Sequence, residues 1–351
     1  MKNLYMPAEW ERHFGTIMIW PERTGSWPYG ARYARPVFAR IIKFICSGER
    51  VFLALSKRGE KSARELLEAE ISSGKVTLWQ VETDDCWARD MAPTFVKRDK
   101  KTVGNDWAFN AWGGSFNGLY KNWLKDDAFA AYVCSALGTD RVDAHPFVLE
   151  GGAIHSDGCG TLIVTEECLL SEGRNPTLDR AEIEGNLKRY LGAERIIWLK
   201  RGICGDETDG HVDNICAFVS KGTVVLAWDE RGIQGDICRE NYKILADSGL
   251  KVIKLPMPEN HVSITEDDMG GFVFEEGEAE REVGEILAAS YVNFYICNAG
   301  VIVPQFGDKN DKAAVKILEE AFPNRKIFPV NARALIVGGG NIHCLTQQIP
   351  E

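Results

Sequence analysis

Short apolar runs alternate with longer stretches of helical periodicity along the chain. The clearest repeat predicts two strands joined by a tight turn, an amphipathic helix and a third strand, at 212–219, 223–228, 236–248 and 251–255. A second copy of this pattern lies at 291–297, 301–303, 309–322 and 326–330. Both turns, 220–222 and 298–300, end in glycine, as tight hairpins often do. Each copy is therefore interpreted as a ββαβ unit.

Three further stretches fit the same unit more loosely. One predicts elements at 153–155, 161–165, 179–191 and 195–199, and another at 93–96, 102–109 and 126–137 with a weak last strand. The fifth combines the two ends of the chain, with strands at 343–347, 16–20 and 51–55 and a helix at 36–47. We predict an α/β protein with a single domain over residues 1–351. Its five ββαβ units would close into a ring without exposed sheet edges. An open α/β sheet is the alternative.

The composition is typical of a soluble protein with a core. Hydrophobic residues make up 45% and charged residues 26%, which excludes disorder, collagen and coiled coil for the whole chain. The net charge of −10 has the wrong sign for binding nucleic acid. No apolar run approaches the roughly 18 residues of a membrane span, and residues 1–10 lack the apolar region of a signal peptide. We expect a cytoplasmic protein with no nucleic-acid or membrane partner, whose acidic run 275–282 is solvated.

Ten cysteines are present without a Cys-x-x-Cys pair, so a zinc ribbon or a thioredoxin-type site is not supported. Cys344 stands out because it closely follows the glycines 338–340, which allow the backbone to approach a thiol closely. A structural turn before a buried cysteine is the alternative. The neighbouring His343 is expected to point to the opposite face of a strand, away from Cys344.

Polar residues stand at or just before the first strands of the predicted units. They are Asp90, Glu150, His211 with Asp213, and Cys344, and the interval from His211 to Cys344 spans two units. In a closed ring, equivalent strand ends point at one axis. We therefore expect these side chains to meet in one pocket.

The pair His211 and Asp213 is predicted to share one face of a strand, because residues i and i+2 do so. A carboxylate beside an imidazole favours its protonated form, as an acid catalyst requires. A structural pair is the alternative, and a metal is not expected because no third ligand of suitable spacing is found. Glu150 would need a cationic partner if buried. Trp87 is either the face of a cation site or a core residue.

Several motifs in the correct order resemble those of the agmatine deiminases, in the guanidine-modifying superfamily, nearly from end to end. They are MPAEW (6–10), WPE (20–22), WARD (87–90), FNAWGG (109–114), LEGG (149–152), RNP (174–176), DGHVD (209–213), SYVNF (290–294) and GGNIHC (339–344). One departure is Met91-Ala92 before Pro93, where the family usually has glycine. The segment 259–287 has little resemblance, and we assign it no role.

The resemblance implies the superfamily's pseudo-symmetric, five-bladed α/β propeller, known as the pentein fold. By motif position it implies that Cys344 is the nucleophile, His211 the general acid and base, and Glu150 the carboxylate that supports the histidine. Asp90 and Asp213 would hold a guanidinium between them.

The substrate-binding residues implied by the resemblance are Asp90, Asp213, Glu207 and Trp87. Because three of these are acidic, we expect a pocket that is acidic throughout and repels a substrate carboxylate. Arg89 is expected to face away from this pocket and to pair structurally.

The implied reaction is hydrolysis of agmatine, a small cationic guanidine, to N-carbamoylputrescine and ammonia through an amidino-cysteine intermediate. No metal or organic cofactor is needed, and a homo-oligomer is implied. The alternatives are a deiminase of arginine or peptidyl-arginine, or a non-catalytic propeller that binds a small molecule.

Overall fold

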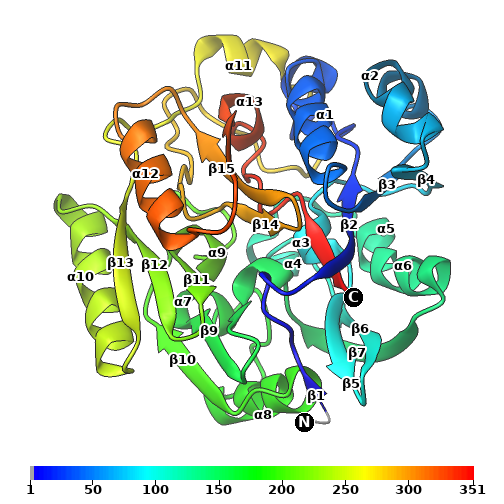
Figure 1. The fold of residues 1–351 in the computed structure, drawn as a ribbon. Helices are drawn as coiled ribbons and strands as arrows, with labels where there is room; N and C mark the ends of the chain where they lie inside the picture. Colours follow the sequence, from blue (N-terminus) through cyan, green and yellow to red (C-terminus); the bar gives the residue numbers. More distant parts are fainter. Residues whose placement is uncertain (1–3) are drawn as a thin grey trace.

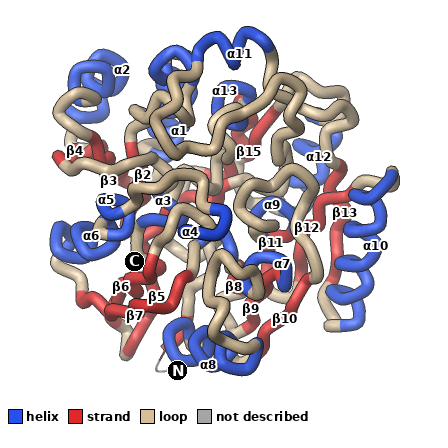
Figure 2. Tube along the Cα trace, turned by 180° about the vertical axis from the view of Figure 1, so that it is seen from behind, coloured by secondary structure: helices blue, strands red, loops and turns tan. Residues whose placement is uncertain are grey.

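The computed structural model describes residues 4–351, so residues 1–3 of the predicted domain lie outside the described residues. Within 4–351 the strands form five mixed sheets, which lie around the middle of the molecule with the longer helices outside (Figure 1, Figure 2). Each sheet contains an antiparallel pair and a parallel pair whose two strands are connected through helix. The predicted α/β class and its repeating ββαβ pattern are therefore confirmed.

One sheet joins the two ends of the chain in the strand order β17-β2-β3-β4. Its strands are β17 (Gln347–Pro350), β2 (His13–Ile19), β3 (Arg50–Leu55) and β4 (Val76–Gln80), with η1 (Pro28–Ala31), α1 (Ala34–Ile45) and α2 (Glu60–Ser72) between them. β17 lies antiparallel to β2. The strand predicted at 343–347 is wrong, because the chain turns there and β17 begins only at Gln347.

The next sheet has the strand order β1-β5-β6-β7. Its strands are β1 (Leu4–Tyr5), β5 (Thr94–Arg98), β6 (Lys101–Ala108) and β7 (Asp140–Val148), with α3 (Ala88–Met91), α4 (Gly114–Asn117), α5 (Leu124–Asp127) and α6 (Phe129–Leu137). The last strand, expected to be weak, is nine residues long. Most of its side chains are not buried, so it has no apolar run that would reveal it.

The third sheet has the order β10-β9-β8, and its later elements fit the prediction closely. The first strand, predicted at 153–155, instead lies at 155–156 and follows a short 3-10 helix. It consists of β8 (His155–Ser156), β9 (Thr161–Thr165) and β10 (Arg195–Leu199), with η2 (Gly151–Ala153), α7 (Glu166–Leu169) and α8 (Arg180–Leu191). α8 begins at a capping box in which the side chains of Asp179 and Glu182 accept each other's backbone N–H, both at 2.9 Å. This local signal explains why the sequence locates the helix start so well.

Two three-stranded sheets complete the fold. One contains β11 (Cys216–Ser220), β12 (Thr223–Trp228) and β13 (Lys251–Pro256), with α9 (Val212–Ile215) and α10 (Gly232–Asp247). The other contains β14 (Tyr295–Cys297), β15 (Gly300–Gln305) and β16 (Ile327–Asn331), with α11 (Glu266–Gly271), α12 (Asp311–Ala321) and α13 (Arg333–Ile336) nearby. The strand predicted at 212–219 is partly wrong, because residues 212–215 form the single-turn helix α9.

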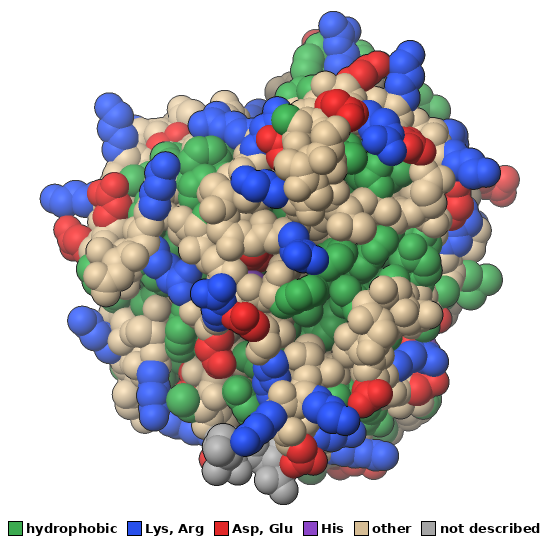
Figure 3. Space-filling view, turned by 45° about the vertical axis from the view of Figure 1, so that its right-hand side comes forward, with side chains coloured by type: hydrophobic (Ala, Val, Ile, Leu, Met, Phe, Trp, Pro, Cys, Tyr) green, Lys and Arg blue, Asp and Glu red, His purple; other side chains and the backbone are tan. Residues whose placement is uncertain are grey.

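None of the helices within residues 4–351 has both the length and the apolar character that crossing a membrane requires. On the face drawn in Figure 3, basic and acidic side chains are intermixed around an apolar area, so that face carries no continuous basic surface. The strands in the middle of the sheets are buried, as β3 illustrates with five buried residues out of six. Burial of these strands supplies the hydrophobic free energy of folding.

Leu53 in β3 provides a test of this packing, because it is fully buried. Leu53→Ala should lower the free energy of unfolding by about 2–5 kcal/mol, since it removes buried methyl groups and leaves a cavity. Thr77→Ala, at an exposed position of β4, is the control and should change it by less than about 1 kcal/mol. Urea unfolding of the three proteins measures both effects, and equal losses in the two variants would contradict the assignment of the core.

Candidate active site

In each of the five sheets, a polar residue stands just before the first strand of the antiparallel pair of its ββαβ unit. Asp90 in α3 precedes β5, Glu150 precedes η2 and β8, and Asp213 in α9 precedes β11. Asn293 precedes β14, and Cys344 precedes β17. The structure brings the side chains of these residues together, as the sequence predicts for the four that it identified.

The position of Gly152 shows how closely three of the groups converge. A methyl group on Gly152 would lie 2.4 Å from His211 Nδ1 and 3.1 Å from both Asp213 Oδ2 and Asp90 Oδ1. Contacts below about 3 Å would force these groups apart, so only glycine leaves their meeting point open.

Cys344 lies in a turn between α13 and β17, and its thiol lines a pocket that Asp90 and His211 also line. The turn packs against Trp87, since a Cβ on Gly340 would lie 2.4 Å from Trp87 Cζ3. Cys344 Sγ lies 3.6 Å from Asp213 Oδ2. Burial, followed by the negative charges of Asp213 and Asp90, raises the pKa of the Cys344 thiol well above its usual value.

Asn293 was not identified as a functional candidate, although it lies in the quoted motif 290–294. Its Nδ2 donates to Cys344 Sγ at 3.2 Å and to Asn214 Oδ1 at 3.0 Å. The interval from His211 to Cys344 could have revealed it, because this interval spans two units and one of them had no polar residue assigned to its first strand. Asn293 lies just before the first strand of that unit.

Asp90 is held by two neutral donors. The backbone N–H of Gly152 donates to its Oδ1 at 2.8 Å, and Trp112 Nε1 donates to its Oδ2 at 3.0 Å. Burial, together with the negative charges of Asp213 and Glu150, raises the pKa of Asp90 to about 6 although His211 opposes the shift. The carboxylate therefore remains mostly ionised at neutral pH.

His211 and Asp213 do not share a strand face, which corrects the sequence prediction. His211 is the N-cap residue of α9 and Asp213 lies in its first turn. Their side chains converge because the chain turns there, with both residues buried. A single-turn helix is too short to produce a helical hydrophobic pattern in the sequence.

Glu150 lies behind His211 and is itself balanced by an arginine. His211 Nε2 lies 3.8 Å from Glu150 Oε2, and Arg174 Nε lies 2.7 Å from Glu150 Oε1. Burial alone would lower the pKa of His211, but Asp90, Cys168 and Glu150 together raise it well above its usual value. The site thus favours a protonated imidazole.

Asp213 lies deeper than the residues that line the pocket. His343 Nδ1 lies 2.9 Å from its Oδ2, while its Oδ1 has no hydrogen-bond partner among residues 4–351. Burial would raise the pKa of Asp213, but the hydrogen bond and charge of His343 outweigh burial and lower it. Asp213 is therefore an anion next to the thiol.

Trp87 and Glu207 both line this pocket, and their role in substrate binding stays a prediction. Trp87 packs against Trp27, with ring centroids 5.4 Å apart, so it also serves as a core residue. Glu207 does not face the pocket as a free carboxylate. Arg281 pairs with both of its oxygens and also donates to Glu285 at 2.9 Å.

Residues 278–281 and Glu285 line this pocket, in a segment to which we assigned no role from the sequence. The prediction that run 275–282 is solvated is only partly right. Ala279 N donates to Leu119 O at 2.9 Å, and Glu278 pairs with Arg23. Glu275, Glu276, Glu280 and Glu282 are exposed, whereas the side chains of Glu278 and Arg281 are only 6% and 9% exposed.

The pocket is consequently not acidic throughout. Its charged lining residues are Asp85, Asp90, Glu207, Glu278, Glu280 and Glu285 against Arg23 and Arg281. Acidic groups remain in excess. The prediction that Arg89 faces away is confirmed, because Arg89 pairs with Gln348 and Glu9 behind the site.

Two groups within residues 4–351 have metal-like spacing, Glu150 with Cys168 and His211, and Glu9 with His155 and His343. The third ligand that sequence spacing did not reveal is thus present in space. However, Arg174 lies 2.7 Å from Glu150 and Arg89 lies 3.5 Å from Glu9. Each carboxylate is thus already paired with a guanidinium, and metal ligation would require the neutral form of the neighbouring histidine.

Residues 5–350 match the model of the Porphyromonas-type peptidyl-arginine deiminase family. The chain belongs to this family. Among curated family relatives, an inferred agmatine deiminase of Selenomonas ruminantium is 49% identical over 99% of this chain and 96% of its own length.

Solved structures give the same result. The agmatine deiminase of Enterococcus faecalis superposes with a TM-score of 0.94 at 39% identity, covering 99% of this chain and 96% of that one. A cysteine-to-serine variant of the C. jejuni agmatine deiminase with substrate bound has a TM-score of 0.82 at 27% identity, with the same coverage of both chains.

Because its pKa is raised, the Cys344 thiol should be alkylated slowly at neutral pH. Iodoacetamide at pH 7 should modify Cys344 at least about tenfold more slowly than the exposed Cys159. Asp213→Asn should accelerate the Cys344 reaction about tenfold, because it removes a negative charge beside the thiol. Peptide mass spectrometry over time measures both rates.

Asp99→Asn, at an exposed turn, is the matched control and should leave both rates unchanged. An Asp213→Asn rate equal to that of the wild type would show that access alone limits the reaction.

Proposed function

We propose that this chain is an agmatine deiminase that hydrolyses the guanidinium of agmatine to N-carbamoylputrescine and ammonia. One observation carries the proposal. His211, Asp90 and Asp213 surround the position next to Gly152, and the Cys344 thiol lies 3.6 Å from Asp213. A nucleophile, a protonated imidazole and two carboxylates are the groups needed to hold and attack a planar cation.

The family relatives support the same activity. Chains 39% and 49% identical over nearly the whole length are named for agmatine. The C. jejuni variant retains its substrate after a cysteine is replaced by serine. That behaviour supports a thiol as the reacting group in the proposed mechanism.

In this mechanism, Asp90 and Asp213 accept hydrogen bonds from the guanidinium and place its carbon beside Cys344. The unpartnered Oδ1 of Asp213 is an acceptor that a substrate N–H would satisfy. The bound cation offsets both carboxylates, which lowers the pKa of the thiol and favours its ionisation.

The Cys344 thiol first gives its proton to solvent water, and the resulting thiolate attacks the guanidinium carbon and forms a C–S bond. His211 gives its proton to the departing nitrogen, so the C–N bond breaks and ammonia leaves. Water then adds to the amidino-cysteine carbon and gives a proton to the neutral His211. The C–S bond breaks, which releases N-carbamoylputrescine and restores the thiol. Glu150, neutralised by Arg174, holds His211 in place throughout.

We also propose that the five sheets of residues 4–351 form the blades of a single propeller domain. The shared antiparallel and parallel pairing supports this, as does the convergence of residues that precede the first strands. A cytoplasmic location, a homo-oligomer and the lack of a nucleic-acid partner stay predictions from the sequence.

The nucleophile assignment is testable with Cys344→Ala. Turnover of agmatine should fall by about a thousandfold or more, because the covalent route is lost. Mass spectrometry of acid-quenched wild-type protein should find the amidino group on the peptide that contains Cys344. Cys204→Ala, at an exposed cysteine, should retain wild-type activity. An adduct on another cysteine would refute the assignment.

Substrate choice follows from the excess of acidic groups in the pocket. The kcat/KM for agmatine should exceed that for arginine by at least about a thousandfold, on the order of 4 kcal/mol. The reason is that arginine carries an additional carboxylate, which the acidic groups of the pocket repel. Glu207→Gln should narrow this ratio, since it leaves Arg281 paired only with Glu285 and weakens the repulsion of a carboxylate.

Steady-state kinetics with both substrates on wild type, Glu207→Gln and Glu65→Gln tests this, the last being an exposed glutamate on α2. The Glu65 variant should keep the wild-type ratio. If arginine or a blocked arginine amide is turned over faster than agmatine, agmatine is not the preferred substrate. The proposed deiminase mechanism would not be affected by that result.

A further inference from the structure

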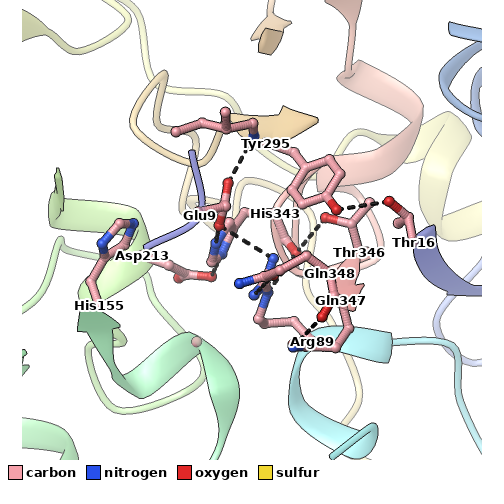
Figure 4. Close-up of polar contacts among 12 residues, drawn as sticks. Glu9, Thr16, Arg89, His155, Asp213, Tyr295, His343, Thr346, Gln347 and Gln348 are labelled. Carbon is pink, nitrogen blue, oxygen red and sulfur yellow. Dashed lines mark hydrogen bonds and ion pairs between the residues drawn. The ribbon is translucent and has the colours of Figure 1, made fainter. Parts of the chain in front are cut away.

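His343 lies behind the site between two carboxylates that come from distant parts of the chain. Its Nδ1 is 2.9 Å from Asp213 Oδ2 and its Nε2 is 2.8 Å from Glu9 Oε2, and all three residues are buried (Figure 4). His343 does not line the pocket, consistent with the expected direction away from Cys344. It nevertheless contacts the carboxylate next to the thiol.

The geometry fixes the protonation state of His343. A neutral imidazole has one N–H donor and one lone pair, so one ring nitrogen would face a carboxylate oxygen with a lone pair. Because both nitrogens lie at hydrogen-bond distance from anionic oxygens, both need a proton. The ring is therefore an imidazolium that bridges Glu9 and Asp213.

Glu9 is fixed firmly enough to serve as the outer end of this bridge. Its Oε1 accepts the backbone N–H of Ile296 at 2.7 Å, and Arg89 Nη2 lies 3.5 Å from its Oε2. Burial would raise the pKa of Glu9, but His343 and Arg89 lower it to about 2. Glu9 thus stays ionised at pH values near neutrality.

The other charged or titratable groups that face His343 are accounted for. Arg89, in α3, donates to the backbone O of His343 at 3.3 Å and to Gln348 Oε1 at 2.7 Å. His155, in β8, stacks on His343 with centroids 6.0 Å apart, and burial lowers its pKa to about 4. His155 is therefore neutral, and His343 is the charge in contact with Asp213.

We propose that His343 is a positioning residue which, held as an imidazolium by Glu9, orients Asp213 and offsets its negative charge beside Cys344. This rests on the proposed function, because the thiol is taken as the nucleophile. Without the imidazolium, the charges of His211 and Arg89 would remain, but Asp213, 3.6 Å from Sγ, would lose the cation that is hydrogen-bonded to it. The thiolate would then be harder to form at neutral pH.

The primary test compares His343→Gln with His155→Gln. Glutamine at 343 retains a donor for Asp213 but no charge. The midpoint of the pH profile for Cys344 alkylation should rise by about one pH unit or more, since a nearby cation is lost. At fixed pH below the midpoint, alkylation and kcat should both fall about tenfold. The His155→Gln control changes a neighbouring buried histidine without removing a cation and should move the midpoint little.

A second variant and a spectroscopic measurement cover the case in which His343→Gln fails to fold. In 15N-histidine-labelled protein, both ring nitrogens of His343 should be protonated at pH 7. Glu9→Gln should lower the pH at which one of these protons is lost. A His343 ring with one bare nitrogen at pH 7 in the wild type would overturn the proposal, as would an unchanged alkylation midpoint in folded His343→Gln.

Alkylation and ring protonation do not require agmatine. If the wild-type protein fails to hydrolyse agmatine while these two measurements give the expected results, the proposed function is wrong and the role of His343 relative to Asp213 and Cys344 stands. If the wild-type protein hydrolyses agmatine but His343→Gln leaves the midpoint of the alkylation profile unchanged, the proposed role of His343 is wrong and the proposed function stands.

Discussion

Buried negative charge is the constraint on which this molecule depends. Glu9, Asp90, Glu150 and Asp213 are each at most 5% exposed, in or directly behind one site. Carboxylates at that depth are tolerated as anions only beside cations or several donors. Arg174 balances Glu150, while His343 and Arg89 together balance Glu9 and Asp213. Each of these carboxylates therefore depends on a cation from another segment of the chain.

Asp90 differs from the other three carboxylates because its hydrogen-bond donors are an amide and an indole. Among residues 4–351, the cation acting on Asp90 is the catalytic candidate His211, and burial raises the pKa of Asp90 to about 6. The charge of Asp90 is therefore the least compensated in the site. A cationic guanidine would supply the missing partner, so the protein gains an interaction on binding that the empty site lacks.

The sequence predicted most elements with strong local signals and several site residues, but little that depends on distant contacts. β9, β10 and β12 match their predicted ranges because their apolar runs end at clear boundaries. The convergence of Asp90, Glu150, His211, Asp213 and Cys344 followed from the repeat and the motifs. The single-turn helix α9 was missed since four residues carry no periodicity. The inward turn of Arg281 and the bridge from Glu9 to His343 join segments 74 and 334 residues apart, for which the chain carries no local pattern.

The antiparallel pairing of β17 with β2 has a consequence for the order in which the protein becomes active during synthesis. Residues 13–19 are synthesised more than 300 residues before their partner strand 347–350. Until then β2 has an unpaired edge, and the turn that carries Cys344 has no strand to anchor it. A nascent chain can thus form the other four sheets before the thiol is held in place. Reactivity toward guanidines would then begin only after residues 347–350 have paired with β2.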